Sequence, residues 1–171
     1  GSRELMEKIR PWRKNLGQVP APEVAALWSR SLRTLVIRVE RQNETALKIA
    51  ETFQDHPAVL RVYYPGLSDH PGHKIAARQM RGFGGMLTLE LHGDFEEAAA
   101  AADRLKLIRI GPSLGGSESL CTQPVTTTHV DLSEEERARR GITPSMIRFS
   151  IGLEDAEDLI EDIRQALGNE E

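Results

Sequence analysis

The sequence predicts an α/β protein of the α+β type, a two-layer sandwich in which a sheet of about four strands carries helices on one face. Segments with the apolar spacing of helices alternate along the chain with short segments rich in β-branched residues. The 171 residues are 39% hydrophobic and 28% charged, a composition that supports one packed core and disfavours wholesale disorder.

Helices are predicted for most of the N-terminal third of the chain. Residues 4–10 have helical spacing, and Pro11 is expected to interrupt that helix. A second helix is predicted to begin at Pro22 and to continue to about Phe53, with residues 41–43 as a place where it can break. A helix of about 30 residues is long for a globular protein and is typical of a domain boundary.

The strands and the remaining helices are predicted after His56-Pro57, which ends the long helix. Ser133 and Glu136 have the spacing of a capping box, and Asp94 can cap a helix that begins at Phe95. The expected strands are 59–63, 84–91, 107–110 and 147–151, and the expected helices are 74–80, 95–105, a short one after 133, and 155–167.

The domain organisation follows from these elements. Residues 1–2, Gly-Ser, are expected to be a remnant of an expression tag, so that the chain is a piece of something longer. Residues 3–54 form an N-terminal segment with the long interdomain helix, and residues 55–171 form a C-terminal α/β domain.

Composition and charge argue against several classes of function. The 22 Lys and Arg against 26 Asp and Glu give a formal net charge of −4, which disfavours nucleic-acid binding. No apolar run approaches the roughly 20 residues that a membrane span needs. The single cysteine, Cys121, excludes an intrachain disulfide and favours a reducing, cytoplasmic compartment. His70 and His73 lack a third ligand nearby, so a metal site is not expected.

Gly111-Pro-Ser-Leu-Gly-Gly-Ser-Glu-Ser119 is the most unusual local sequence. Its small residues let backbone N–H groups approach a ligand closely, and it follows a predicted strand, where α/β folds place their sites. It lacks the glycine spacing and the lysine of a phosphate-binding loop. A ligand site and a tight structural turn are both open interpretations of this segment.

Arg148 is the second unusual feature, because it lies inside an apolar strand. Strand alternation places Ile147, Phe149 and Ile151 on one face, and Arg148 and Ser150 on the other. A guanidinium in this position needs an anion or access to water. It is either half of a structural ion pair with Asp or Glu, or a fork that binds a substrate carboxylate.

A set of short motifs occurs in a fixed order along the chain. The motifs are Tyr63-Tyr-Pro-Gly-Leu67, His70-Pro-Gly-His73, Arg78-Gln-Met80, Gly82-Phe-Gly-Gly-Met86, Ser113-Leu-Gly-Gly116, Glu118-Ser-Leu120, Thr127-Thr-His129, Gly141-Ile142 and Ile147-Arg-Phe-Ser-Ile-Gly-Leu-Glu154. This ordered set resembles the C-terminal half of the Cys/Met-metabolism pyridoxal-phosphate (PLP) enzymes, which include cystathionine γ-synthase, cystathionine γ-lyase, methionine γ-lyase and O-acetylhomoserine sulfhydrylase. Ser31-Leu-Arg-Thr-Leu35 also resembles the long interdomain helix of that family.

The resemblance implies a fold and a set of roles. It implies the small, mainly antiparallel domain of fold-type I PLP enzymes, in which Ser113 and Arg148 hold the α-carboxylate of an amino-acid substrate. Thr128 resembles a family threonine close to the cofactor lysine. Holding the carboxylate orients the bond that is broken relative to the cofactor.

Two departures from the family pattern affect the functional prediction. Pro112 precedes the turn serine where some relatives have an acidic residue, so acidic recognition of a distal amino group has to come from elsewhere. The resemblance also implies a lysine after Ser or Thr that forms a Schiff base with PLP. None of the five lysines follows Ser or Thr; they are Lys8, Lys14, Lys48, Lys74 and Lys106.

The chain is therefore expected to be the C-terminal domain of a PLP-dependent lyase or transferase of sulfur amino-acid metabolism. The parent enzyme is expected to carry out β- or γ-elimination or γ-replacement on cystathionine, methionine, cysteine or an O-acylhomoserine. The expected partners are an N-terminal PLP-binding domain and further copies, in a tetramer for the full-length protein. Alone, the chain is expected to be inactive and to hold no PLP. The alternative is a stand-alone amino-acid-binding, regulatory or assembly domain without catalysis.

Overall fold

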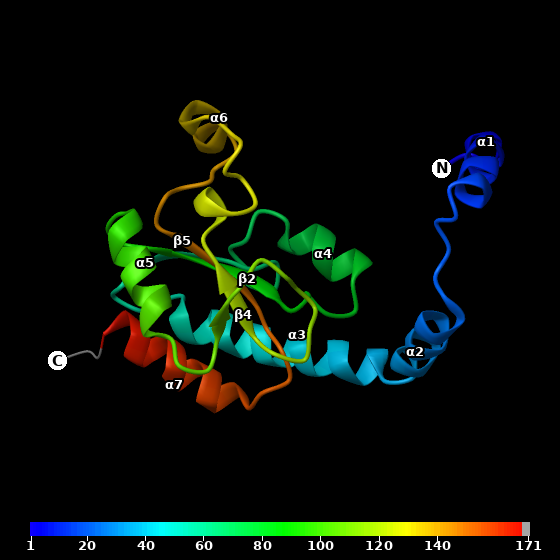
Figure 1. Ribbon diagram of the computed structural model, residues 1–171. Coiled ribbons are helices and arrows are strands. Elements are labelled where there is room, and N and C mark those ends of the chain that lie inside the picture. Colours follow the sequence, from blue (N-terminus) through cyan, green and yellow to red (C-terminus); the bar gives the residue numbers. More distant parts are fainter. Residues whose placement is uncertain (169–171) are drawn as a thin grey trace. The chain divides into compact units, whose positions relative to one another are not determined.

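The computed structural model describes residues 1–168 and divides into two compact units, residues 1–36 and the residues from Ile37 onward. The first unit contains α1 (Arg3–Asn15) and α2 (Pro22–Leu32), which are labelled in Figure 1. Neither helix has a buried residue. Large apolar side chains on both helices are exposed, and those of Trp12 and Trp28 are 67% and 59% accessible.

The helices near the N-terminus differ from the sequence prediction in two ways. α1 continues through Pro11, where a proline removes one helical hydrogen bond without ending the helix. The predicted long helix is two helices, because the chain turns at Arg33 and Thr34. There the backbone N–H of Thr34 donates to the carbonyl of Ser31 at 3.3 Å, and the Thr34 hydroxyl donates to the same carbonyl at 3.3 Å. This local bonding replaces the i to i+4 pattern.

The second unit contains the sheet and the helices that pack on it. Ala46, Ile49 and Phe53 of α3 are fully buried, and this unit includes α3 from Ile37 onward. Its elements are α3 (Leu35–Phe53), β1 (Val59–Tyr63), α4 (His73–Gln79), β2 (Met86–Leu91), α5 (Phe95–Arg104), β3 (Arg109–Ile110), β4 (Leu120–Thr122), a 3-10 turn η1 (Pro124–Thr126), α6 (Glu134–Arg139), β5 (Met146–Ser150) and α7 (Ala156–Leu167).

The sheet has five strands in the order β1-β2-β5-β4-β3. All neighbouring strands are antiparallel except β3 and β4, which confirms the mainly antiparallel sheet. The additional strand, β4, lies at residues 120–122, where the sequence predicts no strand. It is only three residues long, and it is a strand because both of its neighbours, β3 and β5, supply backbone hydrogen-bond partners.

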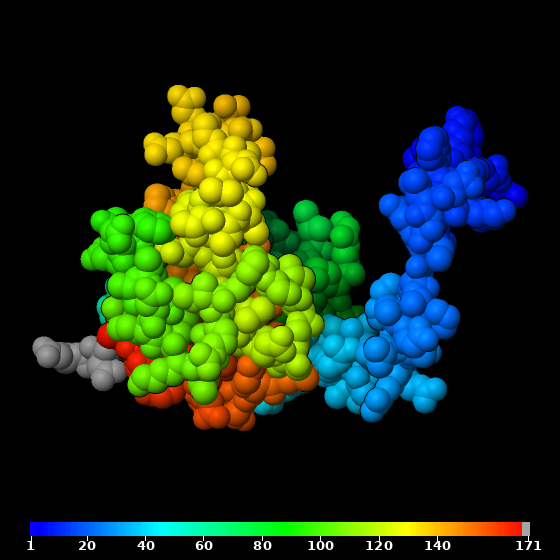
Figure 2. Space-filling model, viewed as in Figure 1, coloured from blue at the N-terminus to red at the C-terminus, as the bar shows by residue number. Residues whose placement is uncertain are grey.

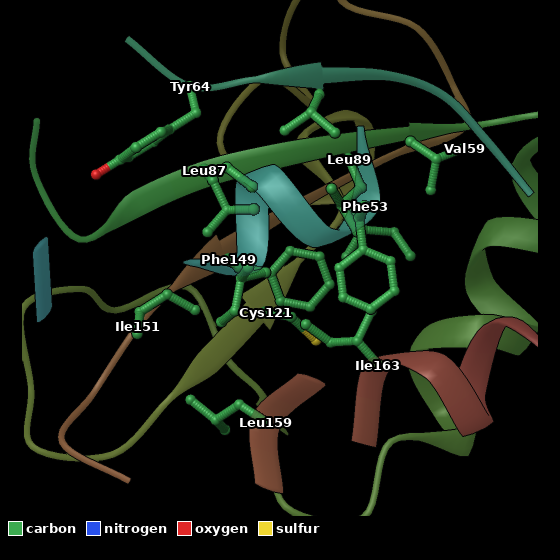
Figure 3. Packing of buried hydrophobic residues seen from close by; sticks show 14 of the residues in the cluster. Phe53, Val59, Tyr64, Leu87, Leu89, Cys121, Phe149, Ile151, Leu159 and Ile163 are labelled. Atoms are coloured by element: carbon green, nitrogen blue, oxygen red, sulfur yellow. The ribbon is translucent and has the colours of Figure 1, made fainter. Parts of the chain in front are cut away.

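The hydrophobic core lies between one face of this sheet and the helices α3, α5 and α7. Figure 3 shows Leu87, Leu89 and Phe149 of the strands meeting Phe53 of α3 and Ile163 of α7. Each of these side chains is at most 2% exposed. The helices therefore cover one face of the sheet, as predicted, and the polar alternate residues of β2, β4 and β5 lie on the other face.

The ends of the helices follow their sequence signals. Asp94 begins α5 with a complete capping box, in which it accepts from the N–H of Glu97 and the Glu97 side chain accepts from the N–H of Asp94. The Ser133 side chain accepts from the N–H of Glu136 at the start of α6. Figure 2 shows α6 and its flanking segments standing out from the rest of this unit.

Two searches of the described structure concern possible functions. No helix among residues 1–168 is both long enough and apolar enough to cross a membrane. In the same part of the chain, no three His, Cys, Asp or Glu side chains are grouped so that they can hold a metal ion.

Candidate functional site

Arg148 lies at the centre of the sheet, on the face opposite the core. In β5 it is paired with Thr88 of β2 on one side and with Thr122 of β4 on the other. Its sequence neighbours Ile147 and Phe149 are each 2% exposed on the core face, which confirms the predicted alternation. The strand therefore holds the guanidinium on a polar surface, with a hydroxyl-bearing residue on each side.

The Arg148 guanidinium has little to hold it within the chain. Its Nη2 donates to the carbonyl oxygen of Pro112 at 3.5 Å, a long hydrogen bond. Among the ion pairs of residues 1–168, none includes Arg148. Of the two interpretations open from the sequence, the structural ion pair is therefore absent from the described structure, and the guanidinium is available to an external anion.

Glu90 is a buried carboxylate on the same face of the sheet, but it is bonded elsewhere. It is 7% exposed, and its Oε2 accepts from the hydroxyl of Tyr63 at 2.7 Å. Burial, and then the hydrogen bond to Glu90, raise the pKa of the Tyr63 phenol. The pairing of Tyr63 with Glu90 satisfies the carboxylate without involving Arg148.

The loop between β3 and β4 (residues 111–119) lies beside Arg148 and is held in place at several points. Gly115 has a φ of +72°, a conformation that favours glycine, and its N–H donates to the Ser150 hydroxyl at 3.0 Å. The carbonyl of Gly116 accepts from the side-chain amide of Gln42, in α3, at 2.8 Å. The loop is therefore ordered by contacts with β5 and α3.

The far end of the loop is bonded to the segment that follows β5. Ser119 is 1% exposed, and its N–H and hydroxyl donate to the two carboxylate oxygens of Glu154 at 2.6 and 2.8 Å. The Ser119 hydroxyl also accepts from the N–H of Gly152 at 2.8 Å. This network fixes the C-terminal end of the loop to the segment that follows the strand carrying Arg148.

Ser113, the predicted partner of Arg148, is exposed in this loop. It directly follows Pro112, whose carbonyl receives the Arg148 hydrogen bond. Its hydroxyl has no hydrogen bond to another side chain in the described structure, and it is free to meet a ligand. The structure thus brings Arg148 and the Ser113 segment together, from positions 35 residues apart in the sequence.

Thr128, the third predicted site residue, has a different local setting. Its hydroxyl is exposed and pairs with Nδ1 of His129 at 2.8 Å. It is the hydroxyl of the preceding residue, Thr127, that bonds to Thr122 beside Arg148, at 2.9 Å. Thr128 is therefore not joined to Ser113 or Arg148 by any hydrogen bond among residues 1–168, and its proximity to a cofactor lysine stays a prediction.

The groups around Arg148 suit a carboxylate better than the PLP cofactor itself. A guanidinium, serine hydroxyls and backbone N–H groups recognise a carboxylate, whereas PLP also needs a lysine amine. In the second unit, Lys48 is ion-paired with Glu157, and Lys74 and Lys106 are exposed on or beside other elements. The described residues of this unit therefore do not form a PLP site.

Sequence reasoning did not identify the residues that order the loop. Gln42 and Glu154 lie 74 and 35 residues away from their partners in the loop. For one loop-ordering residue, Ser150, the sequence did contain a signal, because strand alternation places it on the same face as Arg148. No local pattern could have paired Gln42 with Gly116, because that contact depends on how α3 packs against the sheet.

The chain is similar to one protein family and to individual members of it. The model of a family described as Cys/Met metabolism PLP-dependent enzyme matches residues 1–168. Cystathionine gamma-synthase 1 of Arabidopsis thaliana is 46% identical over 167 residues, which are 98% of this chain and 30% of that protein. Cystathionine gamma-lyase of Bacillus subtilis is 45% identical over 168 residues, which are 98% of this chain and 44% of that protein.

Solved structures of a cystathionine gamma-synthase and a gamma-lyase are similar to nearly the whole chain. A cystathionine gamma-synthase from Xanthomonas oryzae pv. oryzae has a TM-score of 0.89 and 43% identity, over 97% of this chain and 43% of that one. A gamma-lyase from Micromonospora echinospora has a TM-score of 0.91 and 40% identity, over 99% of this chain and 44% of that one. The chain thus spans 30 to 44% of the length of these relatives.

Proposed function

Because this chain belongs to the Cys/Met metabolism PLP-dependent enzyme family, we propose that it is the C-terminal domain of a sulfur amino-acid enzyme and that it binds the substrate α-carboxylate. Arg148 is the main carboxylate ligand, and Ser113 is the second. The single observation that supports this assignment most strongly is the unpaired guanidinium of Arg148 beside an ordered, glycine-containing loop, within 3.5 Å of the Pro112 carbonyl.

The division of work in the whole enzyme follows from these residues. PLP, when bound, supplies the electron sink for cleavage of a bond at the substrate α-carbon. This domain binds the carboxylate and fixes the orientation of that bond, which is a positional contribution to the rate. The Schiff-base lysine belongs to the part of the enzyme outside this chain.

The substrate class that we propose is a sulfur amino acid or an activated homoserine, namely cystathionine, methionine, cysteine or an O-acylhomoserine, in β- or γ-elimination or γ-replacement. Support comes from relatives: one solved cystathionine gamma-synthase, 43% identical, is in complex with cystathionine. A carboxylate ligand is common to all these substrates, so it does not by itself select among them.

We further propose an N-terminal PLP-binding domain and further copies of the enzyme as partners, and a cytoplasmic location. The exposed apolar side chains of α1 and α2 support a protein partner for the first unit. Leu5 and Leu27 are 51% and 59% exposed, and Trp12 and Trp28 are 67% and 59% exposed. Apolar surface of this extent on two helices is typical of an interaction site.

The carboxylate role is tested by replacing Arg148 in the whole enzyme. Arg148→Ala is expected to lower kcat/KM by about 10- to 150-fold, because a hydrogen bond to a charged group contributes about 1.5–3 kcal/mol. Arg109→Ala, an exposed strand arginine on β3, is the matched control and is expected to change kcat/KM less than about twofold. An unchanged kcat/KM in Arg148→Ala would contradict the proposed function.

A further inference from the structure

We propose that Gln42 of α3 is a positioning residue for the carboxylate-binding loop, which it sets at the correct distance from Arg148. This inference rests on the proposed function, because it assigns the loop and Arg148 to one ligand. Gln42 does not itself touch the ligand; it acts through the backbone of Gly116.

The setting of Gln42 is unusual for a glutamine. It is 7% exposed on a helix whose buried face otherwise consists mainly of apolar residues such as Ala46, Ile49 and Phe53. A buried amide is stabilising only when its polar atoms are bonded. Its Nε2 donates to the carbonyl of Gly116 at 2.8 Å, which is good hydrogen-bond geometry. The Gln42 side chain therefore bonds the loop to α3.

The neighbours of Gln42 hold two further loops to the same turn of α3. The Asn43 side chain accepts from the N–H of Gly84 at 2.9 Å. The Arg41 guanidinium donates to the carbonyl of Glu154 at 3.3 Å. Three successive residues of one helix thus anchor three separate segments, of which Gln42 holds the one that carries Ser113.

The bond to Gly116 acts close to the ligand groups. Gly116 is three residues after Ser113, and the adjacent Gly115 donates to Ser150, which is two residues after Arg148 on β5. Gly115 and Gly116 are therefore held by two different elements, β5 and α3. Without Gln42, the loop keeps the bond from Gly115 to Ser150 and the bond from the N–H of Leu153 to the carbonyl of Ser117 at 2.8 Å, but Gly116 loses its bond to α3. The distance between Ser113 and Arg148 then becomes less restricted.

The first test measures loop order in the 171-residue chain without cofactor. Gln42→Leu removes the donor at similar volume, and Gln54→Leu makes the same change at an exposed glutamine just after α3. Amide hydrogen exchange at Gly115 is expected to become at least about tenfold faster in Gln42→Leu and to stay within about twofold in Gln54→Leu. Equal exchange at Gly115 in the two variants would overturn the inference.

The second test measures carboxylate recognition in the PLP-loaded whole enzyme. The probes are L-2-aminobutyrate and its carboxamide, which differ only in the charged group, with Kd taken from the change in cofactor absorbance. Gln42→Leu is expected to weaken binding of the acid by about five- to tenfold and to leave the carboxamide within about twofold. A purely structural role for Gln42 predicts that both probes weaken equally, and that result would contradict a positioning role.

The outcomes separate this inference from the proposed function. The quantity compared is the Kd of the carboxamide divided by the Kd of the acid. If Arg148→Ala leaves this ratio unchanged, the proposed function fails. If Arg148→Ala lowers this ratio and Gln42→Leu does not, the function stands and the inference about Gln42 fails. Gln42→Met, which is unbranched and also lacks the donor, replaces Gln42→Leu in both tests if circular dichroism shows that the leucine variant does not fold.

Discussion

The carboxylate of Asp162 accepts hydrogen bonds from three successive backbone N–H groups, those of Lys106, Leu107 and Ile108, at 2.8, 2.9 and 3.0 Å. The residue is 4% exposed in α7. These bonds fix the segment that leads into β3, and the ligand loop begins directly after that strand. One side chain in the C-terminal helix therefore determines where the loop starts.

Replacing Asp162 with asparagine is expected to lower the free energy of unfolding by about 1.5–3 kcal/mol, because an amide offers one acceptor oxygen and no charge to three donors. Urea denaturation followed by circular dichroism measures the change. Asp158→Asn, an exposed acidic residue on the same helix, is the matched control and is expected to stay within about 0.5 kcal/mol. A loss no larger than that of the control would show that the three bonds contribute little.

At the scale of elements, the ligand loop and the end of β5 approach each other too closely for a side chain. A Cβ added to Gly152 would lie 2.4 Å from the carbonyl oxygen of Ser117 and 2.6 Å from the carbonyl carbon of Glu118. The N–H of Gly152 meanwhile donates to Ser119. A residue without a side chain is needed here so that the N–H of Gly152 can reach the Ser119 hydroxyl and the N–H of Leu153 can reach the carbonyl of Ser117.

Gly152→Ala is expected to destabilise the fold by about 1–3 kcal/mol, the usual range for overpacking, because the loop backbone has to move. Gly111→Ala is the control within the same loop, since its added Cβ would meet only Leu120 at 3.6 Å, an ordinary contact. Thermal unfolding of both variants gives the comparison. Equal melting temperatures for the two would mean that the approach at Gly152 relaxes without cost.

At the scale of the whole molecule, burial is concentrated in the unit from Ile37 onward, and it affects two titrating side chains of the core. Burial raises the pKa of the Cys121 thiol from 9.0 to about 11, with Asp162 and Asp103 adding to the effect. Burial also raises the pKa of Tyr64 from 10.0 to about 12. The Tyr64 hydroxyl donates to the carbonyl of Gly84 at 2.9 Å, so its proton is part of the native hydrogen bonding.

These pKa values predict that the protein loses stability as the pH rises above 9. Between pH 9 and 11 the unfolded chain releases the Cys121 proton and the folded chain keeps it, so ionisation favours the unfolded state. The loss is about 2–3 kcal/mol for the thiol, at about 1.4 kcal/mol per pKa unit, and Tyr64 adds to it above pH 10. Urea unfolding at successive pH values measures how the free energy of unfolding falls with pH. In Cys121→Ala, this free energy is expected to fall less between pH 9 and 10 than in the unchanged protein. An equal fall in both would refute the assignment of the effect to the Cys121 thiol.

Much of the second unit could be predicted from the sequence, because its signals are local. The strand 59–63 matches β1, and the predicted helix 95–105 matches α5 to within one residue. Alternation along β5 placed Arg148 and Ser150 on the same polar face, since a period of two follows from strand geometry alone. The segment after Gly111 was singled out by its composition.

The remaining features depend on hydrogen bonds that the sequence pattern did not indicate. β4 is a strand only because β3 and β5 lie on both sides of it, and α2 and α3 are separate because local bonding around Ser31 and Thr34 ends the first of them. The prediction that Pro11 interrupts the first helix was wrong, because one lost hydrogen bond does not end α1.

By itself, the sequence determined most of the helices and strands of the second unit, the face of the sheet that carries Arg148, and the family, since each depends on local spacing or on the order of motifs. Only the tertiary structure decided that Arg148 has no carboxylate partner among residues 1–168 and that Gln42 and Glu154 order the loop beside it. Those facts come from contacts between residues dozens of positions apart, and the packing of α3 and of the segment after β5 against the loop creates them.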